Sequence, residues 1–126
     1  MFNLTPSVRA VRGEHFGEFG GGLFEAEFKV TPQSDRMGIR LSGARVEGRA
    51  ARDMVSGAVV PGTVQVPPDG QPIILMADAQ TIGGYPQAAH VATADLPILA
   101  QMKPGEGVRF REISLEEAQA LMLPGK

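Results

Sequence analysis

The chain has no cysteine and no tryptophan among its 126 residues, and it has a single tyrosine. Without cysteine there is no disulfide, no thiolate nucleophile and no cysteine ligand for zinc. Twelve basic and 14 acidic residues give a formal net charge of -2, which provides no electrostatic attraction to nucleic acid or to an anionic membrane. We therefore expect neither of these partners.

Long apolar runs are missing as well. The longest aliphatic run, 73–77, is far shorter than the ~18 residues that span a bilayer, and the first residues lack the basic flank and apolar stretch of a signal peptide. We expect a cytoplasmic protein. A length of 126 residues fits one domain, 1–126, built around one hydrophobic core.

Glycine and proline are plentiful, with 16 Gly and 10 Pro spread along the whole chain, which predicts frequent turns and few long helices. Between the turns, short runs have strand character, and polar and apolar residues alternate clearly in two of them. The run 73–77 has no polar residue between its apolar ones and predicts a strand covered on both faces. The sequence thus predicts an all-β core. The predicted strands are 8–12, 23–30, 63–66, 72–77 and 107–113.

Two short helices accompany the predicted strands. The first is expected to begin with Asp95 as its N-cap, to hold Pro97 in its opening turn and to end near Lys103, because the Pro-Gly pair at 104–105 cannot continue it. The second begins at Ser114, which forms a capping box with Glu117. Both helices are interpreted as structural.

One stretch, 34–41, carries charged and hydroxyl side chains that core packing does not require. Arg36 and Arg40, four positions apart, can converge into a clamp for a carboxylate or a carbonyl oxygen, because a planar guanidinium binds carboxylate bidentately and stabilises oxyanion charge. The alternative is that Asp35 pairs with an arginine and only locks the turn. Both interpretations stay open.

A second polar stretch, 78–86, follows the predicted buried strand. Asp78 stands at the strand end, and Gln80 and Thr81 add an amide and a hydroxyl that can orient a small polar substrate. Gly83–Gly84 allows backbone N–H groups to approach a ligand, and Tyr85 offers a phenol or a ring for stacking. Alternatively, Asp78 caps a turn, the glycines serve backbone geometry and Tyr85 packs.

Three further features bear on the site. Gln65 lies in an apolar strand and must be hydrogen-bonded there or face the same pocket, since an unpaired buried amide is costly. His15 and His90 lack carboxylates at metal-ligand spacing, so we propose no metal site. The glycine-rich run 17–22 lacks the Gly-Lys-Ser/Thr ending of a phosphate loop, and no Gly-x-Ser-x-Gly elbow is present.

Several ordered motifs together resemble the allophanate hydrolase subunit 2 family, also called the biotin-dependent carboxyltransferase family or the C subunit of 5-oxoprolinase. They include SDRMGIRL at 34–41 and DAQTIGGYP at 78–86. The resemblance covers nearly the whole chain from about Val8 onward, and it matches the C-terminal half of a usual family member. The motifs are residues 34–41, 56–57, 62–67, 70–75, 78–86, 95–96, 104–105 and 108–110.

The resemblance implies a cyclophilin-like β-barrel and work within a complex of partner subunits. The implied activity is ATP-dependent hydrolysis of a small amide or lactam, in particular 5-oxoproline to glutamate. The alternatives are the carboxyltransferase part of a biotin-dependent urea carboxylase, or a non-catalytic subunit that binds a kinase inhibitor. No cofactor is expected on this chain alone; ATP or biotin enters through partner subunits.

The two polar stretches and the resemblance together give a set of candidate site residues. Three are expected to act in catalysis: Asp35, Arg36 and Asp78. The others are expected to bind the substrate: Arg40, Gln65, Gln80, Thr81, Gly83, Gly84 and Tyr85.

Overall fold

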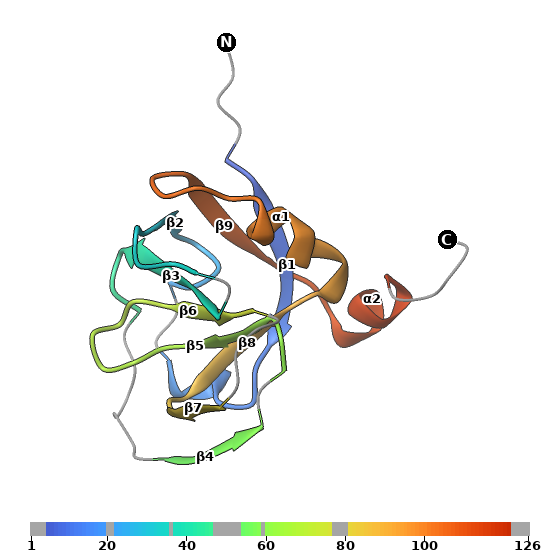
Figure 1. Ribbon diagram of the computed structural model, residues 1–126. Helices are drawn as coiled ribbons and strands as arrows, with labels where there is room; N and C mark the ends of the chain where they lie inside the picture. The colour runs from blue at the N-terminus through green and yellow to red at the C-terminus, as the bar shows by residue number, and fades with distance from the viewer. Residues whose placement is uncertain are drawn as a thin grey trace.

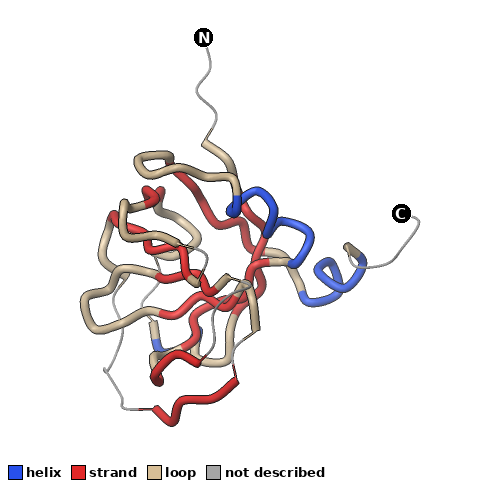
Figure 2. The backbone as a smooth tube through the Cα atoms, viewed as in Figure 1, coloured by secondary structure: helices blue, strands red, loops and turns tan. Residues whose placement is uncertain are grey.

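The computed structural model describes residues 5–19, 22–35, 37–46, 54–58, 60–76 and 81–121 (Figure 1). Short strands dominate it, and two short helices lie beside them (Figure 2). The strands are β1 (Ser7–Arg12), β2 (Glu27–Val30), β3 (Gly38–Gly43), β4 (Met54–Ala58), β5 (Thr63–Gln65), β6 (Ile73–Leu75), β7 (Thr81–Gly84), β8 (Gln87–Val91) and β9 (Gly107–Glu112). The helices are α1 (Leu96–Ala100) and α2 (Leu115–Ala120), and the 3-10 turns are η1 (Phe16–Glu18) and η2 (Thr93–Asp95).

Seven of the described strands close into a barrel in the order β1-β8-β5-β6-β3-β2-β9. The first and last strands, β1 and β9, run parallel to each other and close the ring, whereas the other neighbours are antiparallel. The strands β4 and β7 pair separately as a two-stranded sheet. The prediction of an all-β barrel with two short helices is confirmed.

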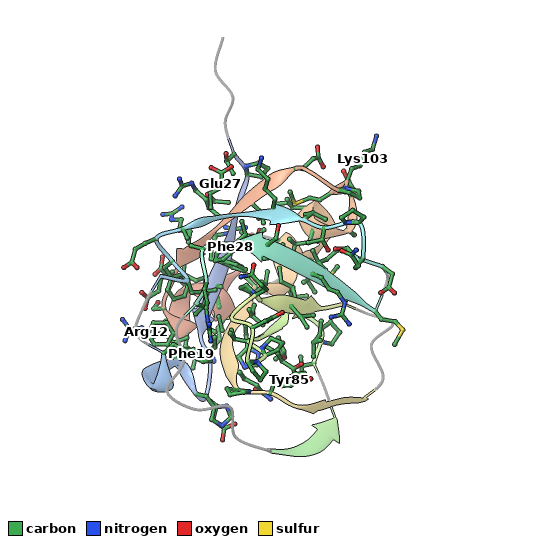
Figure 3. The ribbon with its side chains drawn as sticks, turned by 90° about the vertical axis from the view of Figure 1, so that its left-hand side faces the viewer. Arg12, Phe19, Glu27, Phe28, Tyr85 and Lys103 are labelled. Atoms are coloured by element: carbon green, nitrogen blue, oxygen red, sulfur yellow. The ribbon has the colours of Figure 1, made fainter. Side chains whose placement is uncertain are left out.

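Alternation along the strands fills the inside of the barrel. Phe28 on β2 and Phe110 on β9 are buried and meet edge to face, with ring centroids 5.9 Å apart. Their chain neighbours are exposed, as expected for strands with one face on the core. The strand β6 is buried on both faces, which confirms the prediction from its unbroken apolar run. Figure 3 shows Phe28 among the side chains within the barrel.

The predicted strand from Leu23 begins later than expected, at Glu27. Residues 22–26 form a turn instead, in which the N–H groups of Glu25 and Ala26 donate to the carbonyl of Gly22. Gly22 has a φ of 100°, a conformation that favours glycine, and its own N–H donates to the Glu25 carboxylate at 2.8 Å. These hydrogen bonds within the turn use backbone N–H and carbonyl groups that a longer strand would need for pairing with its neighbours.

The two helices begin where the sequence placed them. Ser114 and Glu117 form the predicted capping box of α2, with both hydrogen bonds at 3.0 Å. Asp95 occupies the N-cap position of α1, but the expected role of its side chain is wrong: the carboxylate makes no cap bond. It accepts instead from the backbone N–H of Arg9 at 2.7 Å and from Arg9 Nε at 2.9 Å, which ties η2 and α1 to β1. No helix in the described ranges is long and apolar enough to cross a membrane.

Candidate functional site

A row of side chains crosses the outer face of the barrel on four neighbouring strands. Arg40 on β3 pairs with Ile73 on β6, Ile73 pairs with Gln65 on β5, and Gln65 pairs with Gln87 on β8. Directly paired residues of antiparallel strands point to the same side, so these four share one face. The residues between them along the strands, among them Leu41, belong to the core, which places the row on the outside.

A pocket of about 530 Å³ opens over the β3 end of this row. Its walls come from the turn before β3, the outer face of β3, the loop between β5 and β6, and the residue that follows β7. Polar side chains make up more than half of the lining. The lining residues are Thr31, Gln33, Asp35, Met37, Gly38, Arg40, Leu41, Ser42, Pro67, Asp69, Gln71, Pro72, Ile73 and Tyr85.

The turn that precedes β3 is built by two side chains that bond to its backbone. Asp35 accepts from the N–H of Met37 at 2.9 Å and from the N–H of Gly38 at 3.2 Å. Ser34 accepts from the N–H of Arg40 at 2.9 Å and donates to its carbonyl at 3.2 Å. One oxygen of Asp35 therefore shapes the turn, and no described arginine forms an ion pair with its carboxylate. Asp35 thus shapes the turn through backbone N–H groups and not through a described arginine, and it also lines the pocket.

Arg40 stands on the exposed outer face of β3, and its side chain lines the pocket. Its backbone is held by Ser34 and by the pairing with Ile73, so the base of the side chain is fixed. Within the described part of the chain, Arg40 is the one basic residue of the pocket lining. Its guanidinium can therefore hold an anionic group of a ligand through two parallel hydrogen bonds.

Gln65 is buried, with 2% of its surface exposed, although it faces the outer side of β5. Among the described residues, its Oε1 has no hydrogen-bond partner. Leaving a buried amide oxygen unpaired costs about 1–3 kcal/mol. Gln65 lies next to Ile73 of the pocket floor, so its oxygen is a candidate acceptor for an N–H group at the edge of the pocket.

Tyr85 follows β7 and is 38% exposed, and it lines the pocket. Figure 3 labels its side chain. The backbone of Thr81 and Gly83–Gly84 forms β7, which pairs with β4. None of these three belongs to the described lining of the pocket. Arg36, Asp78 and Gln80 lie outside the described residues.

The structure thus brings Asp35, Arg40 and Tyr85 to one pocket, and it places Gln65 beside the floor of that pocket. Sequence reasoning did not name Asp69 and Gln71, which belong to the loop between β5 and β6 and also line the pocket. Their signal was weak because a Pro-Pro-Asp-Gly-Gln run is typical of an ordinary turn. Only the contacts of this turn with the end of β3 mark it as part of the site.

His90 is held by Thr63 on the outer face, one row away from Gln65. The hydroxyl of Thr63 donates to the carbonyl of Val60 at 2.8 Å, so it accepts from His90 Nδ1–H at 3.1 Å. Burial lowers the pKa of His90, which keeps the imidazole neutral. His90 is thus a hydrogen-bonded structural residue of this face. In the described ranges, no three His, Asp or Glu side chains gather in a metal-binding arrangement.

Comparison with known proteins gives one family and two groups of relatives. Residues 3–112 match the family described as carboxyltransferase domain, subdomain A and B. The chain is 52% identical to the C subunit of 5-oxoprolinase from Haemophilus influenzae over 95 residues, which is 75% of this chain and 31% of that protein. It is 42% identical to the Escherichia coli protein of the same name over 115 residues, 88% of this chain and 37% of that protein. The chain therefore spans about a third of the length of these relatives.

More distant similarity leads to urea amidolyases. The chain is 31% identical to the urea amidolyase of Lachancea kluyveri over 109 residues, which is 79% of this chain and 6% of that protein. The crystal structure of the K. lactis urea amidolyase superposes with a TM-score of 0.80 at 20% identity, over 94% of this chain and 8% of that chain. At this identity the structural similarity establishes the barrel fold.

Proposed function

Because this chain belongs to the carboxyltransferase domain family, subdomain A and B, we propose that it forms the small-molecule-binding part of a 5-oxoprolinase. The enzyme opens the lactam ring of 5-oxoproline to give glutamate. The observation that supports this assignment is the row formed by a cation, an apolar floor and an amide oxygen: Arg40, Ile73 and Gln65.

The spacing of this row suits a small ring with unlike ends. Arg40 and Gln65 stand on strands separated by β6, so their Cα atoms are about 10 Å apart at a strand spacing of about 4.8 Å. We propose that side chains reaching inward from both ends leave a gap of a few ångströms over Ile73. A five-membered lactam fills that gap with its flat face on Ile73, its carboxylate toward Arg40 and its N–H toward Gln65 Oε1.

The chemistry of ring opening assigns clear tasks to these groups. Water adds to the lactam carbonyl carbon, the C–N bond breaks, and the nitrogen leaves as an amine after it takes up a proton. Arg40 holds the carboxylate that does not react, and Gln65 holds the lactam N–H. Fixing both ends turns the attack into a reaction within one oriented complex, which lowers the entropic part of the barrier.

The remaining candidates stand close to described residues in the sequence. Arg36 directly precedes Met37 and Gly38 of the lining, and Asp78 and Gln80 lie in the segment between β6 and β7. We propose that they complete the site, with Asp35 and Asp78 acting on the proton that moves and Arg36 stabilising the oxyanion. We propose that Thr81 and Gly83–Gly84 contact the substrate through their position before Tyr85.

Partner subunits are part of the proposal. The described residues offer no phosphate-binding loop, so we assign the use of ATP to other subunits of the complex. The pocket of this chain presents the bound lactam to them. The test is to co-purify the chain with its partner subunits and to measure ATP-dependent 5-oxoproline hydrolysis by the assembled complex.

Arg40→Ala tests the role of the pocket within that assay. Loss of a charged hydrogen-bonded pair to the substrate carboxylate is expected to raise KM by about 10- to 100-fold. The free energy of unfolding should change by less than about 1 kcal/mol, because Arg40 is exposed. Arg111→Ala on β9, also an exposed strand arginine, is the matched control and should leave KM unchanged. An Arg40→Ala complex with the KM of the wild type would contradict the assignment.

A second candidate function follows from the similarity to a urea amidolyase. Two carboxylates, Asp35 and Asp69, line the pocket and can accept from the N–H groups of a urea. In that case the chain is the carboxyltransferase part of a biotin-dependent urea carboxylase. Urea-dependent, biotin-dependent turnover of the assembled complex without 5-oxoproline hydrolysis would select it. A stable complex inactive in both assays would favour a non-catalytic subunit that binds a kinase inhibitor.

A further inference from the structure

One wall of the pocket is a loop, residues 67–71, that is hydrogen-bonded at several points to the end of β3 and to residues 45–46. The side-chain amide of Gln71 bonds twice to the backbone of Gly43: its Oε1 accepts from the Gly43 N–H at 2.8 Å, and its Nε2 donates to the Gly43 carbonyl at 3.3 Å. The N–H of Val46 donates to the carbonyl of Gly70 at 2.9 Å. Arg45 Nη2 donates to the carbonyl of Pro68 at 3.0 Å.

The Gln71 side chain continues a strand pairing that the backbone cannot continue. The β3–β6 ladder runs to Arg40 and Ile73, and beyond it the N–H of Leu41 donates to the carbonyl of Pro72. Pro72 has no N–H to return a bond, and the N–H of Gln71 is bound to Asp69 at 2.9 Å. One donor and one acceptor of the side-chain amide therefore take the place of a backbone pair at Gly43.

Close packing strengthens this contact. Gly70 has a φ of 76°, and a Cβ built on it would overlap with Cγ of Arg45 and lie 3.1 Å from the carbonyl oxygen of Val46. The loop thus lies directly against residues 45–46. Because both ends of the Gln71 amide are bonded to Gly43, this side chain holds the loop against the end of β3.

We propose that Gln71 is a positioning residue that fixes the distance between the 67–71 wall and Arg40 and thereby sets the ring size of the lactam that the pocket admits. The same strand, β3, carries Arg40 and, through Gly43, holds the wall. The space for a ligand between Arg40 and the 67–71 loop is therefore bounded on both sides by groups that β3 holds. This inference rests on the proposed lactam-binding function. The attachment of the 67–71 loop to Gly43 by Gln71, called the clamp below, does not depend on that function.

The test removes the hydrogen bonds and keeps the bulk. Gln71→Met preserves length and volume but deletes the donor and the acceptor. Gln119→Met, at an exposed position of α2 away from the pocket, is the matched control. Amide hydrogen exchange, read residue by residue by NMR on the full chain, reports on Val46, whose N–H bonds to the loop at Gly70 and does not touch Gln71 itself.

The expected result is faster exchange at Val46 by about tenfold in Gln71→Met, with no change in the control, since two net hydrogen bonds are lost. Unchanged exchange at Val46 would overturn the clamp. This arm needs no ligand, so its outcome is independent of the proposed function.

The ligand arm compares 5-oxoproline with its six-membered homologue, 6-oxopiperidine-2-carboxylate, by calorimetric titration. A fixed wall should make the wild type prefer the smaller ring by about tenfold or more, as expected for one extra methylene. Gln71→Met should reduce that preference to about threefold or less. Faster exchange with an unchanged preference would overturn the role in ring size. Failure of the wild type to bind either lactam would count against the proposed function, and the exchange result would still decide the clamp.

Discussion

At the scale of single residues, the described side chain with the most consequential electrostatics lies away from the pocket. Asp95 is 3% exposed and accepts from the backbone and the guanidinium of Arg9. Hydrogen bonding to Arg9 holds the pKa of Asp95 below its usual value, against the opposing effect of burial. The contribution of this carboxylate to stability is therefore present above the pKa of the unfolded state and is lost as the pH falls through the lower pKa of the folded state.

Asp95→Asn is expected to reduce the free energy of unfolding by about 2–4 kcal/mol at pH 7, because the partly buried Arg9 loses its counter-charge. The difference from the wild type should shrink below about pH 3.5, where the wild-type carboxyl is protonated in the unfolded chain. Urea denaturation at pH 7 and at acid pH measures both. Glu112→Gln, which removes the exposed ion pair with Arg12, should cost less than about 1 kcal/mol. A difference for Asp95→Asn that does not depend on pH would exclude this account.

His90 gives a second prediction at the residue scale. Burial lowers its pKa, so the unfolded chain binds the proton more readily, and stability attributable to His90 is lost as the pH falls through the unfolded value near 6.5. Nitrogen-15 NMR should show the neutral Nδ1–H tautomer at pH 7 and a titration midpoint below 6.5. His15 is the internal comparison: its Nδ1 accepts from the N–H of Gln87 at 3.0 Å, so its neutral form should carry the proton on Nε2. An Nε2–H tautomer at His90 would contradict the assigned bond.

At the scale of elements, two of the strands that the sequence predicted alternate with large apolar side chains. Phe28 and Val30 mark β2, and Val108 and Phe110 mark β9. The strand β8 gave a weaker signal because two of its three buried residues are alanines, which carry little apolar surface. The strand β3 does alternate, with Ile39 and Leu41 inward, but its polar outward residues were interpreted as part of a functional stretch and not as one face of a strand.

The candidate site could likewise be predicted only in part from the sequence. Arg40 and Tyr85 could be named from the sequence because a charged side chain and an aromatic ring stand in the two polar stretches, 34–41 and 78–86. Their meeting in one pocket depends on the register between β3 and β6 and on the path from β7, which local patterns do not specify. The Gln71 contact with Gly43 spans 28 positions of the chain, and nothing local to either residue reveals it.

The helix α2 gives a prediction at the element scale. It buries none of its residues, so its capping box is a large part of what holds it. Ser114→Ala is expected to speed amide exchange in residues 115–121 by about fivefold and to leave the thermal midpoint of the barrel unchanged. Ser42→Ala, a serine on the exposed face of β3, is the control for the substitution itself. A lowered midpoint for Ser114→Ala would mean that α2 is coupled to the barrel more tightly than its exposure indicates.

At the scale of the whole molecule, the barrel is closed by its first and last strands. The parallel pairing of β1 with β9 joins Val8 to Phe110, which are 102 positions apart, and both belong to the one core cluster of described residues. Neither strand can leave without opening the ring and exposing that core. The pocket lies against β3 and β6, two other strands of the ring, so its geometry depends on the closed barrel.

The single tyrosine makes this dependence measurable. Tyr85 is the one Tyr of the chain, which has no Trp, and it lines the pocket, so its fluorescence reports on the site, while far-ultraviolet circular dichroism reports on the strands. Because β3 and β6 of the barrel carry residues that line the pocket, the fluorescence and the circular dichroism should share one midpoint in urea, as in a two-state transition. A fluorescence change at lower urea than the loss of strand signal would show that the wall carrying Tyr85 opens by itself. In that case the pocket would be a locally stable unit added to the barrel, and the register of β3 and β6 alone would not fix the distance between Tyr85 and Arg40.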